Sequence, residues 1–302
     1  MYKKDYLRDY IKQSEIRVFN DKIRIRLSSE LATKYDNGAY KNFLILIDDG
    51  LKMLDRLELK YPANSKPTLY IYIVPDDNFA ELLGMPTLYA KNKSKWGKPV
   101  VCYDLDGFTF AYGLSQNCLE NKEFSNIKID YLENQLHELS HIVLGQFLVG
   151  NQVLSEGIAE VLPLYILNLE QDFEEHRQIV SNLKESDIYS IKELLNKQRE
   201  GLYGNDSVIP NSTCSFRLSY ISSYLFIRGL LETIEEKYSL TSIEAIKTFF
   251  GILKSNRGYG NEFLIYDIAD ALELSQDKLL IEKSMQLKAL DSIKKLENGE
   301  KW

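Results

Sequence analysis

The chain has 302 residues, of which 44% are hydrophobic and 27% are charged, as expected for a globular protein with a sizeable core. Its net charge of −7 argues against nucleic acid as the main partner, because no basic surface dominates. The three cysteines are widely spaced and form no CxxC pair, so they predict neither a disulfide framework nor a cysteine-based zinc site.

The sequence also bears on membranes and location. No apolar stretch reaches the roughly 18 residues needed to span a bilayer, so we expect no membrane partner. The amino terminus lacks the apolar segment of a secretory signal, which favours a cytoplasmic protein. A secreted mature form whose leader has been removed fits the same sequence. The oligomeric state is unknown at this level.

The first part of the chain has the patterns of strands interrupted by a helix. Alternation and β-prone residues predict four strands, at residues 23–27, 69–74, 99–103 and 108–112. A helical periodicity spans residues 39–60. We therefore expect residues 1–125 to form an N-terminal α/β subdomain with an edge strand.

From about residue 128 onward the pattern becomes helical. Apolar residues recur at steps of three and four up to Phe147, and His137 and His141 lie at the edge of this stripe. Later helices are predicted at residues 174–184, 187–199, 218–237, 242–255, 262–272 and 275–297, and the Gly- and Asn-rich segment 201–215 is predicted to be a loop. Residues 126–302 are thus expected to form a helical subdomain that completes one catalytic unit.

The segment His137-Glu138-Leu139-Ser140-His141 is an HExxH sequence, and it holds two of the three histidines in the chain. On a helix, residues four apart lie on one face, so both imidazoles can reach a single Zn²⁺ ion. Glu138 then lies beside the metal, where it can accept a proton from an activated water. The pattern predicts His137 and His141 as zinc ligands and Glu138 as the general base.

A catalytic zinc usually has three protein ligands, so a third ligand must come from elsewhere in the chain. His176 stands among acidic residues that indicate an exposed helix, and the HExxHxxGxxH pattern fails because Leu144 and Phe147 occupy two of its positions. A carboxylate is therefore expected. Glu156 is the best candidate, because the 14 residues that separate it from His141 include a turn that can bring a second helix back to the histidines.

Glu160 lies one helical turn beyond Glu156, on the same face of the expected helix. It can accept a hydrogen bond from the ring N–H of a zinc histidine, which would fix the tautomer and orientation of that ring. Judged from the residues alone, the two glutamates can exchange the ligand and supporting roles.

Residues 137–160, HELSHIVLGQFLVGNQVLSEGIAE, resemble the gluzincin metallopeptidases, in particular the peptidase MA-like group, in which HExxH is followed by a short connector and an EGxAE helix. The Ser-Glu-Gly-Ile-Ala segment is also similar to a helix of zinc aminopeptidases whose glutamate is the third ligand. The resemblance implies that Glu156 is the ligand and Glu160 the supporting residue. It spans roughly residues 100–290, but only its zinc motif is specific.

This resemblance implies an α+β, zincin-like fold, with an N-terminal mixed sheet and helices, a mainly helical C-terminal part and an active-site cleft between them. It places the strand 108–112 at the sheet edge, where an extended peptide can add as a further strand. The implied cofactor is one Zn²⁺ ion per chain, and the implied partner is a peptide or protein substrate. The implied activity is hydrolysis of peptide bonds.

Tyr220 is the candidate that stabilises the oxyanion of this reaction, because it begins a segment similar to a downstream helix of the family. Tyr224 and residues of the loop 201–215 are rivals for that role. Packing in a helix interface is the other explanation for a tyrosine in a chain that has 20 of them.

A second class of function is compatible with the same residues. A catalytically inactive zinc-containing module could bind peptides or partner proteins without cleaving them, and hydrolysis of a non-peptide amide is a third alternative. The sequence identifies neither the substrate nor its side-chain preference, and it does not distinguish endopeptidase from exopeptidase action.

Overall fold

The computed structural model describes residues 14–19, 23–28, 41–57, 68–74, 100–104, 109–115, 137, 140–141, 151–167, 180–204, 217–255 and 261–297. The chain divides into two compact units, Met1–Val143 (unit 1) and Leu144–Trp302 (unit 2), and each is described by itself. The predicted boundary between residues 125 and 126 falls outside the described residues and stays a prediction.

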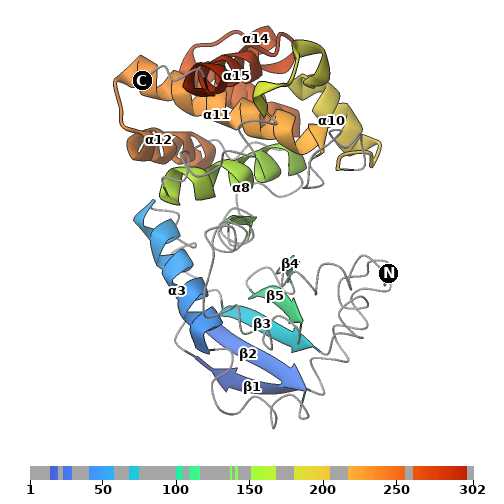
Figure 1. The fold of residues 1–302 in the computed structure, drawn as a ribbon, viewed down its shortest axis with the longest axis vertical. Helices are drawn as coiled ribbons and strands as arrows, with labels where there is room; N and C mark the ends of the chain where they lie inside the picture. Colours follow the sequence, from blue (N-terminus) through green and yellow to red (C-terminus); the bar gives the residue numbers. More distant parts are fainter. Residues whose placement is uncertain are drawn as a thin grey trace. The chain divides into compact units, whose positions relative to one another are not determined.

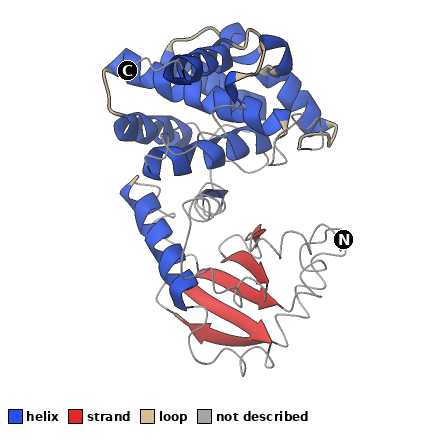
Figure 2. Cartoon of the chain, viewed as in Figure 1, coloured by secondary structure: helices blue, strands red, loops and turns tan. Residues whose placement is uncertain are grey.

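Unit 1 contains a five-stranded sheet in the order β1-β2-β3-β5-β4, with the strands labelled in Figure 1 and drawn in red in Figure 2. Neighbouring strands β2, β3 and β5 run parallel, whereas β1 pairs with β2 and β4 pairs with β5 in antiparallel fashion. Isoleucine, valine and tyrosine are frequent in these segments, and such residues pack well on a pleated surface. The strands are β1 (Ser14–Val18), β2 (Ile23–Ser28), β3 (Thr68–Val74), β4 (Val100–Asp104) and β5 (Thr109–Ser115).

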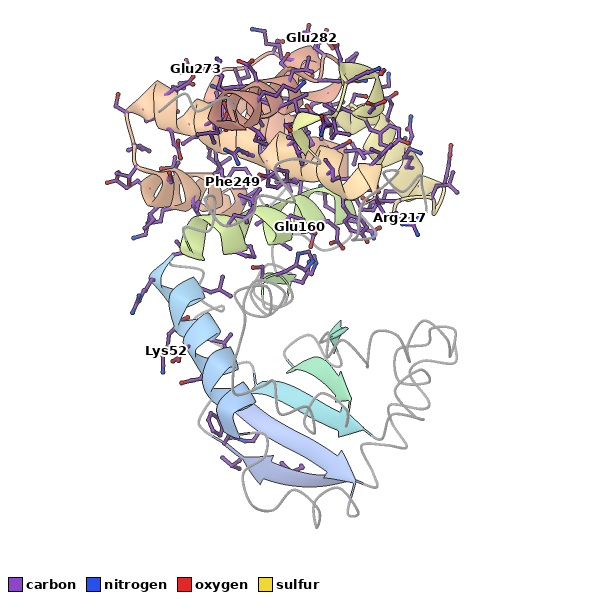
Figure 3. The ribbon with its side chains drawn as sticks, viewed as in Figure 1. Lys52, Glu160, Arg217, Phe249, Glu273 and Glu282 are labelled. Carbon is purple, nitrogen blue, oxygen red and sulfur yellow. The ribbon has the colours of Figure 1, made fainter. Side chains whose placement is uncertain are left out.

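Helix α3 (Lys41–Arg56) lies between β2 and β3 in the sequence. Because β2 and β3 are parallel, the chain needs a crossover between them, and α3 provides it. Leu51 and Leu54 on this helix are buried, whereas Lys52 is exposed and forms ion pairs with Asp48 and Asp49 (Figure 3).

The prediction that the strand 108–112 forms a sheet edge is wrong. β5 lies between β3 and β4, pairing in parallel with one and antiparallel with the other. The chain reverses direction after β4, and β5 then takes the inner position beside β3. The order of strands along the sequence does not determine their order in the sheet, so β4 is the edge strand on this side.

Unit 2 is organised around one central helix, α11, which packs against α8, α10, α12 and α15 (Figure 1). Buried side chains make up 14 of the 21 residues of α11, as expected for a helix that is surrounded by others. The helical elements of unit 2 are α8 (Gln152–Leu167), the 3-10 helix η3 (Glu185–Asp187), α10 (Ile191–Arg199), α11 (Leu218–Tyr238), α12 (Ser242–Ser255), α13 (Asn261–Leu272), α14 (Gln276–Leu280) and α15 (Ser284–Glu297).

The predicted α+β, zincin-like class is wrong. The described part of the chain is predominantly helical, and every element described after Ser115 is a helix. The strands belong to unit 1, whereas unit 2 builds its core from contacts between helices. The strands and the helices that follow Ser115 thus fall largely in different compact units, and the predicted cleft is withdrawn with the fold class. Alternation indicates where strands form but not which elements cover them.

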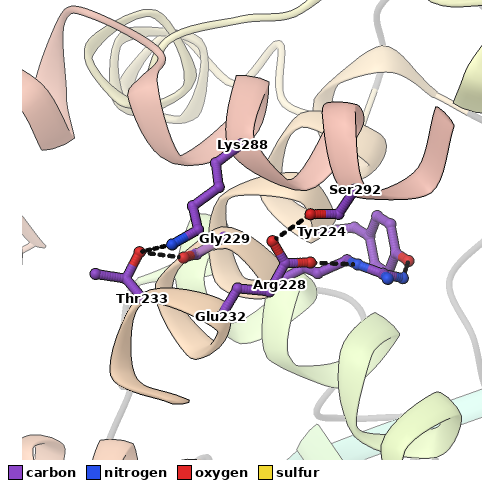
Figure 4. A network of polar contacts seen from close by, with 7 residues as sticks. All are labelled: Tyr224, Arg228, Gly229, Glu232, Thr233, Lys288 and Ser292. Carbon is purple, nitrogen blue, oxygen red and sulfur yellow. Dashed lines mark hydrogen bonds and ion pairs between the residues drawn. The ribbon is translucent and has the colours of Figure 1, made fainter. Parts of the chain in front are cut away.

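A network of buried polar side chains joins α11 to α15 (Figure 4). The Arg228 guanidinium donates one hydrogen bond to the Glu232 carboxylate, at 3.0 Å, and another to the Tyr224 hydroxyl, at 2.9 Å. The Ser292 hydroxyl of α15 donates to the second oxygen of Glu232, at 3.0 Å. Arg228 and Glu232 are each only 3% exposed, so each charge depends on the other for compensation.

None of the helices described in the structure is long and apolar enough to cross a lipid bilayer. The longest of them, α11, carries Arg228 and several glutamates among its 21 residues. Its burial is accounted for by the helices around it in unit 2.

Candidate metal centre

Helix α8 carries both candidate glutamates, and its amino terminus is held by two side chains. The Asn151 side chain accepts a hydrogen bond from the backbone N–H of Leu154, at 3.0 Å, which is the usual way in which asparagine caps a helix. The Gln198 side chain of α10 accepts another from the N–H of Gln152, at 3.1 Å. These bonds fix where α8 begins and therefore which face carries Glu156.

The side chains of α8 divide between a buried face and a partly exposed one. Val153, Leu154 and Ile158 are buried in the core of unit 2. Glu156 and Glu160 are each of intermediate exposure, and Figure 3 shows Glu160 projecting from the helix. The spacing of four residues puts the two carboxylates on the same face, as the sequence predicts.

Gly157, which follows the candidate ligand directly, is the point of closest approach between α8 and α11. A Cβ atom at this position would lie 2.6 Å from the Ser223 carbonyl oxygen and 2.8 Å from Cγ1 of Ile227. Only glycine lets the two helix backbones come this close. The contact therefore sets the distance between the glutamates of α8 and the side chains of α11.

We expect Gly157→Ala to lower the free energy of unfolding by about 1–3 kcal/mol, because an added methyl group must push α8 away from α11. Denaturant unfolding of the two proteins measures this change. Gly251→Ala is the matched control, since Gly251 is exposed in helix α12 and a Cβ there meets nothing within 4 Å. The control should be stabilised by about 0.5–1 kcal/mol, and equal losses in both variants would contradict the close-packing argument.

The two histidines of the HExxH sequence are helical and face each other. Their Nε2 atoms are 3.2 Å apart, and the ring planes are inclined by 82° with centroids 4.8 Å apart. Both rings are partly exposed, whereas Ser140 between them is fully buried. The two imidazole Nε2 atoms are therefore close enough to share one ion.

His137, His141 and Glu156 form a group whose donor atoms all lie within 4.8 Å of one another, so the group could hold a metal ion. Two nitrogen ligands about 2.0–2.1 Å from a tetrahedral zinc are separated by about 3.3 Å. The 3.2 Å between the Nε2 atoms fits this geometry. Two imidazoles and one carboxylate are also a ligand set of catalytic zinc sites. The donor set therefore fits zinc, while the grouping itself shows only that these residues could hold a metal ion.

The roles predicted for Glu138 and Glu160 remain predictions. Glu138 lies outside the described residues, so its role as general base stays a prediction. Glu160 is one turn beyond Glu156 on α8, and it is not one of the three residues of the metal-binding group. Its supporting role stays a prediction as well.

The structure distinguishes the candidates that the sequence offered for oxyanion stabilisation, which are Tyr220, Tyr224 and the loop 201–215. Tyr220 lies in the first turn of α11 and is partly exposed, so its ring is accessible. Tyr224 is only 3% exposed, and its hydroxyl accepts a hydrogen bond from Arg228 within the buried network. In the predicted loop 201–215, the described tyrosine is Tyr203, which is buried.

Tyr203 is the residue of this region that the sequence did not single out. Its hydroxyl lies 2.8 Å from the hydroxyl of Ser223, and its ring packs edge-on against Tyr220. Burial raises the pKa of Tyr203 well above its usual value, and the nearby charges of Glu156 and Glu160 raise it further, although the bond to Ser223 opposes them. Tyr203 therefore stays protonated close to both glutamates. Its position between two turn glycines was the one available hint in the sequence.

Comparison of the chain with protein-family models, with curated proteins and with solved structures finds no match. The likeness of residues 137–160 to the gluzincins therefore stays an expectation drawn from the sequence.

Proposed function

We propose that this chain is a zinc-dependent metallopeptidase that hydrolyses peptide bonds. The observation that carries the proposal is the grouping of His137, His141 and Glu156, with donor atoms within 4.8 Å of one another. Two of these residues come from an HExxH sequence and the third from a separate helix, α8. A donor set of this kind leaves one position of a tetrahedral metal open for water or substrate.

A bound zinc ion would supply a Lewis acid that polarises the scissile carbonyl and lowers the pKa of water. In the proposed reaction, Glu138 accepts a proton from the attacking water and later delivers it to the leaving amine. Tyr220 donates a hydrogen bond to the oxyanion. Glu160 orients one of the ligand histidines by accepting a hydrogen bond from its ring N–H.

Glu138→Gln tests this proposal, because glutamine keeps the size of the side chain but cannot accept the proton. We expect the variant to retain the zinc content of the wild type and to lose at least about 100-fold in kcat on a peptide that the wild type cleaves. Zinc content is measured by atomic emission, and cleavage is followed by mass spectrometry of a broad peptide library.

Glu282→Gln serves as the control, because Glu282 is exposed in the turn that follows α14 (Figure 3) and its substitution should alter neither quantity. A zinc-loaded wild type that cleaves no peptide of the library would contradict the peptidase proposal. That outcome, combined with tight binding of library peptides, would identify the chain as a binding module instead.

A further inference from the structure

The turn that follows α10, residues 201–204, is held in a fixed conformation. The N–H groups of Leu202 and Tyr203 both donate to the carbonyl of Lys197, at 2.8 and 3.2 Å. Gly201 and Gly204 have φ values of +71° and +74°, in the left-handed region that favours glycine. Two glycines and the bonds to the end of α10 thus determine where Tyr203 is placed.

This turn contacts the beginning of α11 at three points. The backbone N–H of Gly204 donates to the Ser219 hydroxyl, at 3.1 Å, and the Tyr203 hydroxyl lies 2.8 Å from that of Ser223. The rings of Tyr203 and Tyr220 meet edge to face, with centroids 5.4 Å apart and planes inclined by 71°. Edge-to-face packing is a preferred arrangement of two aromatic rings.

Gly204 is also close to the hydroxyl of Tyr220. A Cβ atom on Gly204 would lie 3.0 Å from the Tyr220 hydroxyl oxygen and 3.2 Å from Cε2 of the same ring. The phenol thus rests on the glycine backbone at one side and against the Tyr203 ring at another. A side chain held from two sides loses little freedom when it binds a ligand, which is the benefit of preorganisation.

The same turn lies within the electrostatic field of the candidate ligand. The charges of Glu156 and Glu160 act on the buried Tyr203 phenol, as does the neighbouring Tyr220. Ser223 links the turn to α8, because its hydroxyl contacts Tyr203 while its carbonyl packs against Gly157, the residue after Glu156. The contacts therefore connect Tyr220 with the glutamate-bearing helix inside unit 2.

We infer that Tyr203 and Gly204 are positioning residues that form a seat for the Tyr220 phenol beside α8, the helix that carries Glu156. The catalytic part of this inference rests on the proposed peptidase function. Tyr203 itself does not touch the substrate, because it is buried and bonded to Ser223. Tyr220 is the partly exposed member of the pair.

Two glycine variants test whether Gly204 helps to position the Tyr220 phenol. Gly204→Ala and Gly201→Ala impose the same left-handed strain on alanine, but a Cβ at Gly201 meets nothing within 4 Å, whereas one at Gly204 meets the Tyr220 hydroxyl. In protein labelled with 3-fluorotyrosine, the ¹⁹F resonance of Tyr220 is identified by its absence from Tyr220→Phe. We expect this resonance to shift clearly more in Gly204→Ala than in Gly201→Ala, because both variants carry the strain and only the alanine at Gly204 contacts Tyr220.

The effect on catalysis is tested by measuring kcat and KM on a peptide that the wild type cleaves. By comparison with the loss of one oxyanion donor, Tyr220→Phe should reduce kcat about 100-fold, and Gly204→Ala should reduce it about 10-fold, with little change in KM. Tyr203→Ala should also lower kcat, but the double variant with Tyr220→Phe should be no slower than Tyr220→Phe alone, because Tyr203 acts through Tyr220.

The possible results distinguish failure of the positioning role of Tyr203 and Gly204 from failure of the peptidase proposal. A Tyr220 resonance that shifts no more in Gly204→Ala than in Gly201→Ala would overturn the seat, and Tyr203→Leu provides the same resonance test if Gly204→Ala does not fold. A shifted resonance with equal kcat in Gly204→Ala and Gly201→Ala would overturn the link to catalysis while the seat stands. A wild type that cleaves no peptide refutes the peptidase proposal, and the resonance still decides on the seat.

Discussion

Glu156→Ala is expected to abolish stable zinc binding, whereas Glu160→Ala should weaken it by about 10- to 100-fold, the effect usual for a residue that orients a metal ligand. Glu156 contributes a donor atom to the group with His137 and His141, so its removal leaves only two protein ligands. Two imidazoles alone do not complete a catalytic zinc site. Zinc affinity of each purified variant is measured by competition with a chromophoric chelator.

The two variants are matched, because Glu156 and Glu160 have similar exposure and lie one turn apart on α8. Unfolding curves of the zinc-free proteins show whether either substitution disturbs the helix itself. Zinc retained by Glu156→Ala but lost by Glu160→Ala would reverse the roles assigned to the two residues. Equal retention in both would remove the carboxylate ligand from the proposal altogether.

Arg228→Met should destabilise the folded chain by about 3–5 kcal/mol at neutral pH, because it leaves the Glu232 carboxylate buried without its partner. Burial already raises the pKa of Glu232, and the Arg228 charge and its hydrogen bond oppose that rise. Replacing Arg228 removes both the charge and the hydrogen bond that oppose the rise in the pKa of Glu232. The free energy of unfolding, measured in denaturant between pH 4 and pH 8, tests the prediction.

The pH dependence has a definite sign. A carboxyl group whose folded pKa exceeds its unfolded value of 4.5 contributes stability that is present below that value and is lost as the pH rises through the folded pKa. The penalty of Arg228→Met should therefore shrink toward acidic pH, where Glu232 is protonated. The double variant Arg228→Met/Glu232→Met should recover most of the stability, since it buries no charge. A pH-independent penalty would mean that lost packing, and not charge, is responsible.

The helices of unit 2 show where periodicity suffices for prediction and where it fails. The pattern predicted residues 242–255, and α12 has those bounds. The single helix predicted at 275–297 is wrong, because the structure contains α14 and α15 with Lys283 at a φ of +55° between them. The start of α15 is determined by packing, since the Met285 carbonyl rests directly on Gly229 of α11.

Among the strands, β1 was not predicted. Its sequence, SEIRV, places Ile16 and Val18 on a surface where they are 50% and 68% exposed, so it lacks the pattern of a strand with one buried face. β1 is a strand because its backbone pairs with β2, which is a contact between segments that local patterns do not encode. The strand 108–112 was wrongly predicted at the sheet edge for the same reason, because strand order also depends on pairing between distant segments.

The sequence by itself determined which side chains can bind the metal. HExxH requires only the local geometry of one helix turn, and the spacing of Glu156 and Glu160 requires only that of another, so both could be recognised without a fold. The local spacing alone left the ligand role open between Glu156 and Glu160, and the tertiary structure groups Glu156 with the two histidines. It also singled out Tyr203 and Gly204 beside Tyr220, since contacts between residues some 17 positions apart arise from helix packing and turn geometry.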